Sequence, residues 1–212
     1  MIALRAFAAL LSYPGEEMRR ALPEIADAVR SEPLIAARER DGVLALIDEL
    51  TGAEPLAAEE RYVELFDRGR ATSLNLFEHL HGDDRERGAA MVELKRHYER
   101  AGFELATKEL PDYLPVVLEY LSCRDPSETR DILSDCAHIL KSIAKALIAR
   151  GSRYAAVLQA LLVIAGERPI DAASVPRIRA SAANPDRDWF EEPAFARAPI
   201  SAARGQPNPE TQ

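Results

Sequence analysis

Cysteine is scarce in this 212-residue sequence, and the scarcity bears on both compartment and chemistry. The two cysteines, Cys123 and Cys136, form no C-x-x-C pair. Scattered thiols in a chain of this size are typical of reduced residues in a cytosolic protein, because disulfides persist in oxidising compartments. We therefore expect two free thiols and a cytoplasmic location.

Long apolar runs are also lacking. No stretch approaches the roughly 20 apolar residues that a membrane-spanning helix needs. The apolar start, residues 2–11, has no basic region before it, and Tyr13-Pro14-Gly15 follows without a small-residue cleavage site. We expect this start to remain on the protein as a first helix, and we expect no stable membrane association.

The sequence has no excess of positive charge. Its 35 acidic residues outnumber its 27 Lys and Arg residues, which gives a formal net charge of -8. Nucleic-acid-binding proteins need a cationic surface that displaces counterions from phosphates, so the charge argues against that class. An acidic surface serves either solubility or a partner that carries Lys or Arg, and charge alone leaves both interpretations open.

Signatures of common enzymes are absent. The sequence has no glycine-rich phosphate loop, no G-x-S-x-G elbow and no H-E-x-x-H motif. The nearest approach to a metal motif is Glu78-His79-Leu80-His81, an E-x-x-H sequence of the kind that di-metal bundles use in pairs. The only similar motif in the sequence, residues 135–138, has Asp in place of Glu. We expect a non-enzymatic protein without a cofactor, and a metal-binding helical-bundle enzyme using Glu78 and His81 is the alternative.

Helical periodicity dominates residues 3–166, and no alternating run bounded by hairpin turn residues predicts a strand. The fold class is therefore all-α, and a single-domain helical bundle is expected. Asp83 with Glu86 forms a capping-box pattern, and the last helix is apolar enough to be buried. The sequence predicts helices over 2–11, 16–31, 33–52, from Pro55 onward, 83–101, 112–122, 126–150 and 153–165.

The composition changes after Gly166, where seven prolines interrupt every possible long helix. We expect three parts: an all-helical domain over 1–166, a Pro-rich irregular tail over 167–201, and a disordered C-terminus over 202–212. The tail contains the only Trp, in the pair Trp189-Phe190. An apolar pair in a polar tail most often packs back on its own domain, so partial docking is expected there.

The segment 65–82 concentrates aromatic and charged side chains in an irregular connection between helices. It can be interpreted as a loop held by its own ion pairs, with Thr72 or Ser73 capping a short helix. It can equally be a recognition site, because loops on a rigid frame commonly carry function. Its candidate site residues are Phe66, Asp67, Arg70, Phe77, Glu78, His79 and His81.

A second candidate segment is 108–115, which contributes Glu109, Asp112, Tyr113 and Leu114. The helix dipole explains the two carboxylates without any function, because they lie in or beside a first helical turn. The additional feature is Tyr113, since an amphipathic ring beside negative charge suits a peptide that is both basic and apolar.

At these segments the sequence resembles the molybdenum-cofactor assembly chaperones of respiratory nitrate reductase. They are part of the redox-enzyme maturation chaperones for twin-arginine-type leader peptides. The block 66–91 is the most specific part, and one departure is Tyr113, where the wider class often has His. The matching residues are 10–14, 62–74, 76–79, 81–82, Arg85, 87–88, 90–92, Tyr98, 109–112, 114–115, 118–121 and 152–155.

The resemblance implies a specific role. Such chaperones bind the N-terminal segment of the reductase's catalytic alpha subunit. They keep the apo alpha–beta complex in the cytoplasm, competent for insertion of the molybdenum cofactor, before the complex attaches to the membrane. Any contact of the chaperone with the cofactor itself is expected to be indirect.

Our hypothesis for the mechanism is helix-in-groove recognition, in which the client segment lays an amphipathic helix into an apolar groove. The apolar anchors would contact Phe66, Phe77 and Leu114. The basic residues of the segment would meet the carboxylates of Asp67, Glu78, Glu109 and Asp112. A scaffold or dimerisation module that binds no leader peptide is a further alternative.

Overall fold

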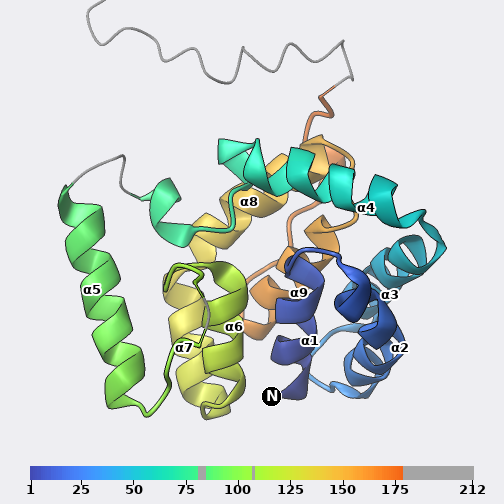
Figure 1. Ribbon diagram of the computed structural model, residues 1–212. Coiled ribbons are helices and arrows are strands. Elements are labelled where there is room, and N and C mark those ends of the chain that lie inside the picture. The colour runs from blue at the N-terminus through green and yellow to red at the C-terminus, as the bar shows by residue number, and fades with distance from the viewer. Residues whose placement is uncertain (81–84, 107, 179–212) are drawn as a thin grey trace, which may run out of the picture. The chain divides into compact units, whose positions relative to one another are not determined.

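The computed structural model describes residues 1–80, 85–106 and 108–178, and within these ranges it contains helices and no strand. The predicted all-α class is confirmed. Figure 1 shows the helices in chain order, from α1 at the N-terminus to α9. The α-helices are α1 (Ile2–Leu11), α2 (Glu16–Ser31), α3 (Ala37–Gly52), α4 (Pro55–Tyr62), α5 (Arg85–Arg100), α6 (Leu114–Ser122), α7 (Pro126–Asp135), α8 (Ala137–Ala149) and α9 (Ala155–Ile164).

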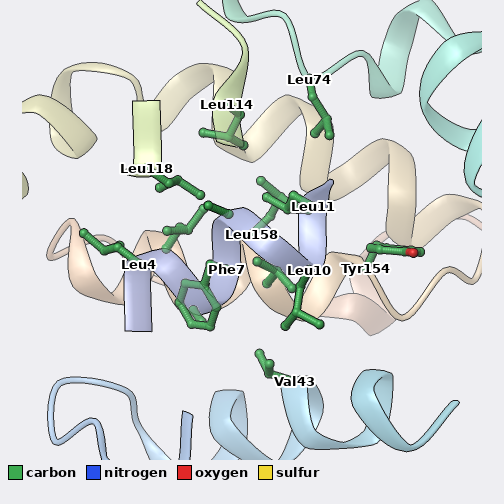
Figure 2. Packing of buried hydrophobic residues seen from close by; sticks show 14 of the residues in the cluster. Leu4, Phe7, Leu10, Leu11, Val43, Leu74, Leu114, Leu118, Tyr154 and Leu158 are labelled. Carbon is green, nitrogen blue, oxygen red and sulfur yellow. The ribbon is translucent and has the colours of Figure 1, made fainter. Parts of the chain in front are cut away.

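Helix α1 lies at the centre of the hydrophobic core. It packs against α2, α6 and α9, and Figure 2 shows Leu114 and Leu118 of α6 directed toward Leu4 and Leu11. These four leucines are at most 1 % exposed. Full burial of one such side chain contributes about 1.5–3 kcal/mol, so these contacts fix α6 firmly against α1.

Helix α9 is the second central element, as its apolar sequence predicts. Its buried face packs against α3, α7 and α8. The chain that follows α9 docks on α9 itself, because the side-chain amide of Gln159 forms two hydrogen bonds with the backbone of Ile170 (2.7 and 2.9 Å). The backbone N–H of Ile178 also donates to the carbonyl of Ala149 (2.8 Å).

Several helix ends follow the predicted signals. Gly102 and Gly151 adopt positive φ angles of 73° and 68°, just after α5 and α8 end. This left-handed conformation suits glycine and is a common way to terminate a helix. At the start of α4, the Glu54 carboxylate accepts from the backbone N–H of Ala57, and Pro55 occupies the first turn. The predicted Asp83 cap and the pair Trp189-Phe190 lie outside the described residues.

The predicted helix over 126–150 is wrong as a single element, because the chain breaks at Cys136 into α7 and α8. Cys136 has ψ near -1°, and Ile139 N–H donates back to its carbonyl. Helix α7 packs against α6 and α9, whereas α8 packs against α9 and a 3₁₀ turn at residues 70–72. Both helices contact α9, but their other neighbours differ, and the apolar spacing that runs through the break does not reveal this.

Two predicted helix starts are also wrong. Helix α3 begins at Ala37 rather than at Pro33, because the Arg40 guanidinium donates to the carbonyls of Glu32 and Ile35 and holds residues 32–36 in a turn. Helix α6 begins at Leu114 rather than at Asp112. The backbone of residues 112–114 is engaged instead by a neighbouring segment.

That neighbouring segment is 74–76, and its pairing brings the two candidate site segments together. The backbone N–H of Leu114 donates to Leu74 (2.8 Å), and that of Leu76 donates to Asp112 (3.1 Å), around an antiparallel bridge between Asn75 and Tyr113. This bridge joins the irregular connection after α4 to the start of α6.

The connection itself begins with an unusual helix. Residues Val63–Asp67 continue α4 as a π-helix, and the chain then forms 3₁₀ turns at Arg70–Thr72 and Leu76–His79. Single π-helical turns occur frequently at functional sites. Among the residues described, no helix is both long enough and apolar enough to cross a membrane.

Candidate functional site

A pocket of about 280 Å³ opens where the two candidate segments meet. Four of the predicted site residues line it, namely Phe66, Asp67, Glu109 and Tyr113. Tyr13 and Tyr62 also line it, although neither was predicted as a site residue. Both lie in the segments 10–14 and 62–74 that carry the family resemblance, which was the signal that could have identified them. The remaining lining residues are Ser73, Leu74 and Asn75.

Aromatic rings form one wall of this pocket. The Tyr62 ring lies 4.8 Å from that of Phe66, and Phe66 makes an edge-on contact with Tyr154 at 5.1 Å. The ring of Tyr13 stands edge-on to Tyr62 at 5.7 Å. Rings at these distances add about 0.5–1.5 kcal/mol per pair beyond their burial. The wall is therefore rigid and apolar.

The tyrosine hydroxyls of the wall are fixed by the end of α1. Tyr62 donates to the carbonyl of Leu11 (2.8 Å), and its hydroxyl also lies 3.0 Å from that of Tyr113. The last carbonyls of a helix have no partner within the helix, so these hydroxyls satisfy one of them. Burial raises the pKa of Tyr62 and, despite the opposing hydrogen bond from Tyr62, that of Tyr113. Both side chains stay neutral at physiological pH.

Carboxylates give the pocket a negative rim. Asp67 and Glu109 are exposed at its edge. The charge of Asp67 acts on Tyr13, Tyr62 and Tyr113, and raises the pKa of each as one of several causes. Glu109 acts on Tyr113 in the same direction. The rim therefore attracts a cation, whereas the wall behind it accepts an apolar group.

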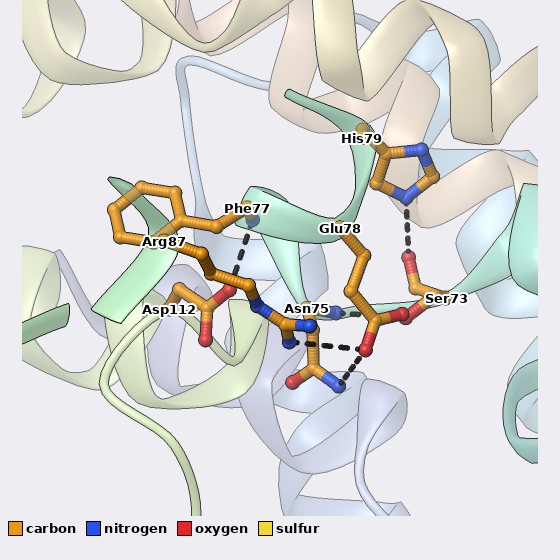
Figure 3. Close-up of polar contacts among 7 residues, drawn as sticks. All are labelled: Ser73, Asn75, Phe77, Glu78, His79, Arg87 and Asp112. Atoms are coloured by element: carbon orange, nitrogen blue, oxygen red, sulfur yellow. Dashed lines mark hydrogen bonds and ion pairs between the residues drawn. The ribbon is translucent and has the colours of Figure 1, made fainter. Parts of the chain in front are cut away.

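A second group of predicted residues forms a polar network that includes Ser73 and Asn75 of the pocket lining (Figure 3). Asp112 is fully buried, and its carboxylate accepts from the backbone N–H of Phe77 (2.9 Å). The Glu78 carboxylate pairs with Arg87 of α5 (3.1 Å) and accepts from the Asn75 amide (3.4 Å). These contacts fix the turn at 76–79 to the starts of α5 and α6.

The two carboxylates of this network differ in pKa. Burial penalises the charge of Asp112 more than the Phe77 N–H and Arg87 favour it, so its pKa is raised. Burial acts in the same direction on Glu78, but hydrogen bonds from Ser73 and Asn75 and the charge of Arg87 outweigh it, so its pKa is lowered. Glu78 is therefore a charged partner of Arg87.

The other predicted site residues lie away from the pocket lining. Arg70 is exposed on its 3₁₀ turn, and Leu114 is 1 % exposed in the core. The His79 ring nitrogen Nε2 lies 2.9 Å from the Ser73 carbonyl, and His81 lies outside the described residues. Thr72 is buried and donates to the carbonyls of Leu65 and Gly69.

Neither Thr72 nor Ser73 caps the short helix at 76–79, whose N-cap is Asn75 without a side-chain hydrogen bond. The predicted cap by Thr72 or Ser73 is therefore wrong. Over residues 1–80, 85–106 and 108–178, no group of three or more His, Cys, Asp or Glu side chains gathers in a geometry that could hold a metal ion. The Glu78 carboxylate of the E-x-x-H motif is occupied by Arg87.

Gly69 is required by the close packing of the turn that follows the π-helix. A Cβ at this position would lie 2.6 Å from the Thr72 hydroxyl and 2.9 Å from the Leu65 carbonyl oxygen. Thr72 is held by its own hydrogen bonds and has no room to move. We expect Gly69→Ala to lower the free energy of unfolding by about 1–3 kcal/mol, measured by urea denaturation.

Gly88 provides the matched control, because a Cβ there meets nothing within 4 Å and the residue lies inside α5. Gly88→Ala is expected to leave stability unchanged or to raise it by up to about 1 kcal/mol. Equal effects of the two substitutions would contradict the close packing at Gly69.

The raised pKa of Asp112 predicts a pH-dependent contribution to stability. A carboxyl whose pKa is higher in the folded state binds a proton more readily there, so folding gains stability as pH falls through the folded pKa toward the ordinary value of 3.8. Asp112→Asn lacks this titration. The difference in unfolding free energy, wild type minus variant, is expected to grow as pH falls through that range, and a constant difference would contradict the raised pKa.

The fold and the site define a class, an all-helical protein with an acid-rimmed aromatic pocket between the connection after α4 and the start of α6. The chain belongs to the nitrate reductase delta subunit family, whose model matches residues 14–159. That range contains every lining residue of the pocket except Tyr13. The family expected from the sequence is confirmed.

Curated relatives cover most of the chain. It is 42% identical over 165 residues to the nitrate reductase molybdenum cofactor assembly chaperone NarJ of Escherichia coli (strain K12). The aligned region covers 78% of this chain and 70% of that protein. It is 34% identical over 162 residues to the protein named probable nitrate reductase molybdenum cofactor assembly chaperone NarJ of Bacillus subtilis (strain 168), over 76% of this chain and 86% of that protein.

Proposed function

We propose that this chain is a non-enzymatic chaperone for molybdenum cofactor assembly of a nitrate reductase. We propose further that its pocket holds the N-terminal segment of the alpha subunit. The family and the names of the relatives support the first statement. The observation that carries the second is the pocket itself, in which an aromatic wall lies beside a carboxylate rim.

The pocket supports a form of helix-in-groove recognition in which only part of the bound segment enters the protein. A volume of about 280 Å³ accepts one or two side chains, so the client anchor enters against Phe66 and Tyr113 while the rest of the segment lies on the surface. Its basic residues then meet Asp67 and Glu109. Asp112 is buried and Glu78 is paired with Arg87, so these two residues act by positioning the segment 74–79 beside the pocket.

The energies are compatible with reversible binding. A buried anchor contributes about 1.5–3 kcal/mol, and each exposed charge pair at the rim adds about 0.2–1 kcal/mol. Ordering the segment costs a few kcal/mol. These contributions nearly cancel the ordering cost, so most of the binding free energy has to come from apolar surface that the rest of the segment buries outside the pocket, at about 25 cal/mol per Å².

The client is the apo alpha–beta complex in the cytoplasm, before membrane attachment. Holding the alpha N-terminus keeps that complex competent for insertion of the molybdenum cofactor. The cofactor is cargo of the client, and the chaperone influences it indirectly.

Isothermal titration calorimetry tests this function. The purified chain is titrated with a synthetic peptide that has the N-terminal sequence of the alpha subunit, and a scrambled peptide of the same composition is the control. We expect saturable heat with one peptide per chain for the native sequence and none for the scrambled one. Absence of saturable heat at tens of micromolar chaperone would overturn the proposal.

A further inference from the structure

A second pocket, of about 430 Å³, shares Tyr13 with the aromatic pocket. Residues 56, 59, 60, 63 and 64 contribute to it, and they recur at the three- and four-residue steps that mark one helical face. This face is the outer side of α4 and of the π-helix that continues it. The lining residues are Tyr13, Leu56, Glu59, Glu60, Val63, Glu64 and Arg68.

The outer face of α4 carries apolar side chains that the fold leaves in solvent. Ala58 and Tyr62 point into the core and are at most 4 % exposed, whereas Leu56 is 60 % exposed and Tyr13 is 49 % exposed. Exposed large apolar side chains that gather in a recess mark interaction sites more often than scattered ones do. The recess therefore offers an apolar floor that no described segment of this chain covers.

The charges around this floor are mostly negative. Glu59 accepts a hydrogen bond from the Tyr13 hydroxyl (3.0 Å). Glu60 and Glu64 are exposed, and within the described ranges their carboxylates make no hydrogen bond or salt bridge. Arg68 is the only cation among the lining residues, so three carboxylates face one guanidinium and the recess retains a negative field.

Tyr13 connects the two pockets because its ring belongs to the lining of both. One side of it contacts Tyr62 edge-on at 5.7 Å, and its hydroxyl reaches Glu59. A segment seated in the aromatic pocket therefore has to pass Tyr13 to reach the carboxylates of Glu60 and Glu64. On a helical segment, residues three or four apart are neighbours with about 5–6 Å between their Cβ atoms, so such a pair can straddle a single side chain such as Tyr13.

We infer that the second pocket is a subsite for a lysine or arginine side chain of the same bound segment. The aliphatic stem of that side chain packs on Leu56 and Val63, and its charged head lies between Glu60 and Glu64. Tyr13 separates this subsite from the apolar one. The inference rests on the proposed function and adds a rule of specificity: the client carries a basic residue three or four positions from its apolar anchor.

A double-mutant cycle tests the subsite. Each Lys or Arg of the alpha-subunit peptide is replaced in turn by norleucine, which keeps the aliphatic stem and removes the charge. Each peptide is titrated into the wild type and into the double variant Glu60→Gln, Glu64→Gln. We expect one peptide position at which the replacement weakens binding to the wild type by roughly two- to fivefold and leaves binding to the variant unchanged. High salt should remove this coupling.

The matched control is the double variant Glu17→Gln, Glu24→Gln, which removes two exposed charges from α2 that line neither pocket. It should leave the effect of every peptide replacement as in the wild type. If no peptide position couples to Glu60 and Glu64 while the unmodified peptide still binds, the subsite is wrong and the proposed function stands. If the unmodified peptide does not bind the wild type, the proposed function itself fails.

A second copy of this chain is the competing occupant of the recess. Light scattering of the wild type and of Leu56→Glu distinguishes it, because a docking face between copies would give a dimer that the new charge disrupts. A single-chain mass for both proteins supports the subsite. A dimer that Leu56→Glu dissociates would overturn it.

Discussion

Replacement of Tyr113 by alanine is expected to weaken binding of the alpha-subunit peptide by about 30-fold, equivalent to about 2 kcal/mol. The Tyr113 ring lines the pocket beside the carboxylate rim, and its removal takes away a wall that the apolar anchor contacts. Buried aromatic anchors of this kind dominate the energetics of interfaces. Titration calorimetry with the variant and the wild type measures the ratio of dissociation constants.

Tyr113→Phe is the control that separates the ring from its hydroxyl. It keeps the wall and loses the contacts of the hydroxyl with Tyr62 (3.0 Å) and with the Leu11 carbonyl (3.4 Å). Tyr62 still donates to Leu11, so binding is expected to change by less than about threefold. A folded Tyr113→Ala protein that binds the peptide as tightly as wild type would place the site elsewhere.

Phe66→Ala should have the largest effect on stability, lowering the free energy of unfolding by about 3–5 kcal/mol. The Phe66 side chain is 7 % exposed and lies between the rings of Tyr62 and Tyr154. Its removal leaves a cavity that the surrounding rings do not fill, because α1 and α9 hold them in place. Urea denaturation monitored by circular dichroism gives the change in unfolding free energy.

Leu56→Ala provides the comparison on the same helical segment, because Leu56 is 60 % exposed. Its effect is expected to stay within about 0.5 kcal/mol. If Phe66→Ala were as mild as Leu56→Ala, the aromatic wall would not be a packed part of the core, and the rigidity of the pocket would have no physical basis.

Sequence periodicity predicted most of the fold, because each helix buries one apolar face and ends at a residue with a clear backbone preference. Gly102 and Gly151 end their helices with positive φ angles, as expected. The break at Cys136 was not predictable in this way. The apolar spacing continues through it, and the change of direction depends on which helices α7 and α8 pack against.

The sequence predicted which two segments belong together better than it predicted the contacts within them. The two segments at 65–82 and 108–115 meet through the bridge between Asn75 and Tyr113. A sequence shows that Asp112 is a carboxylate, but it does not show that the side chain is fully buried against the Phe77 N–H. Burial depends on tertiary packing, which is also why Tyr62 was missed: its contribution depends on the end of α1.

The central proposal is that the alpha-subunit segment binds in the acid-rimmed aromatic pocket. Amide hydrogen exchange of the chain with and without the peptide, followed by mass spectrometry, tests it directly. If the segment binds there, amide exchange is expected to slow in residues 62–76 and 109–114, whereas the exchange rates in α2 stay the same. Protection confined to α2 and α3, or no protection under conditions that saturate binding, would contradict it.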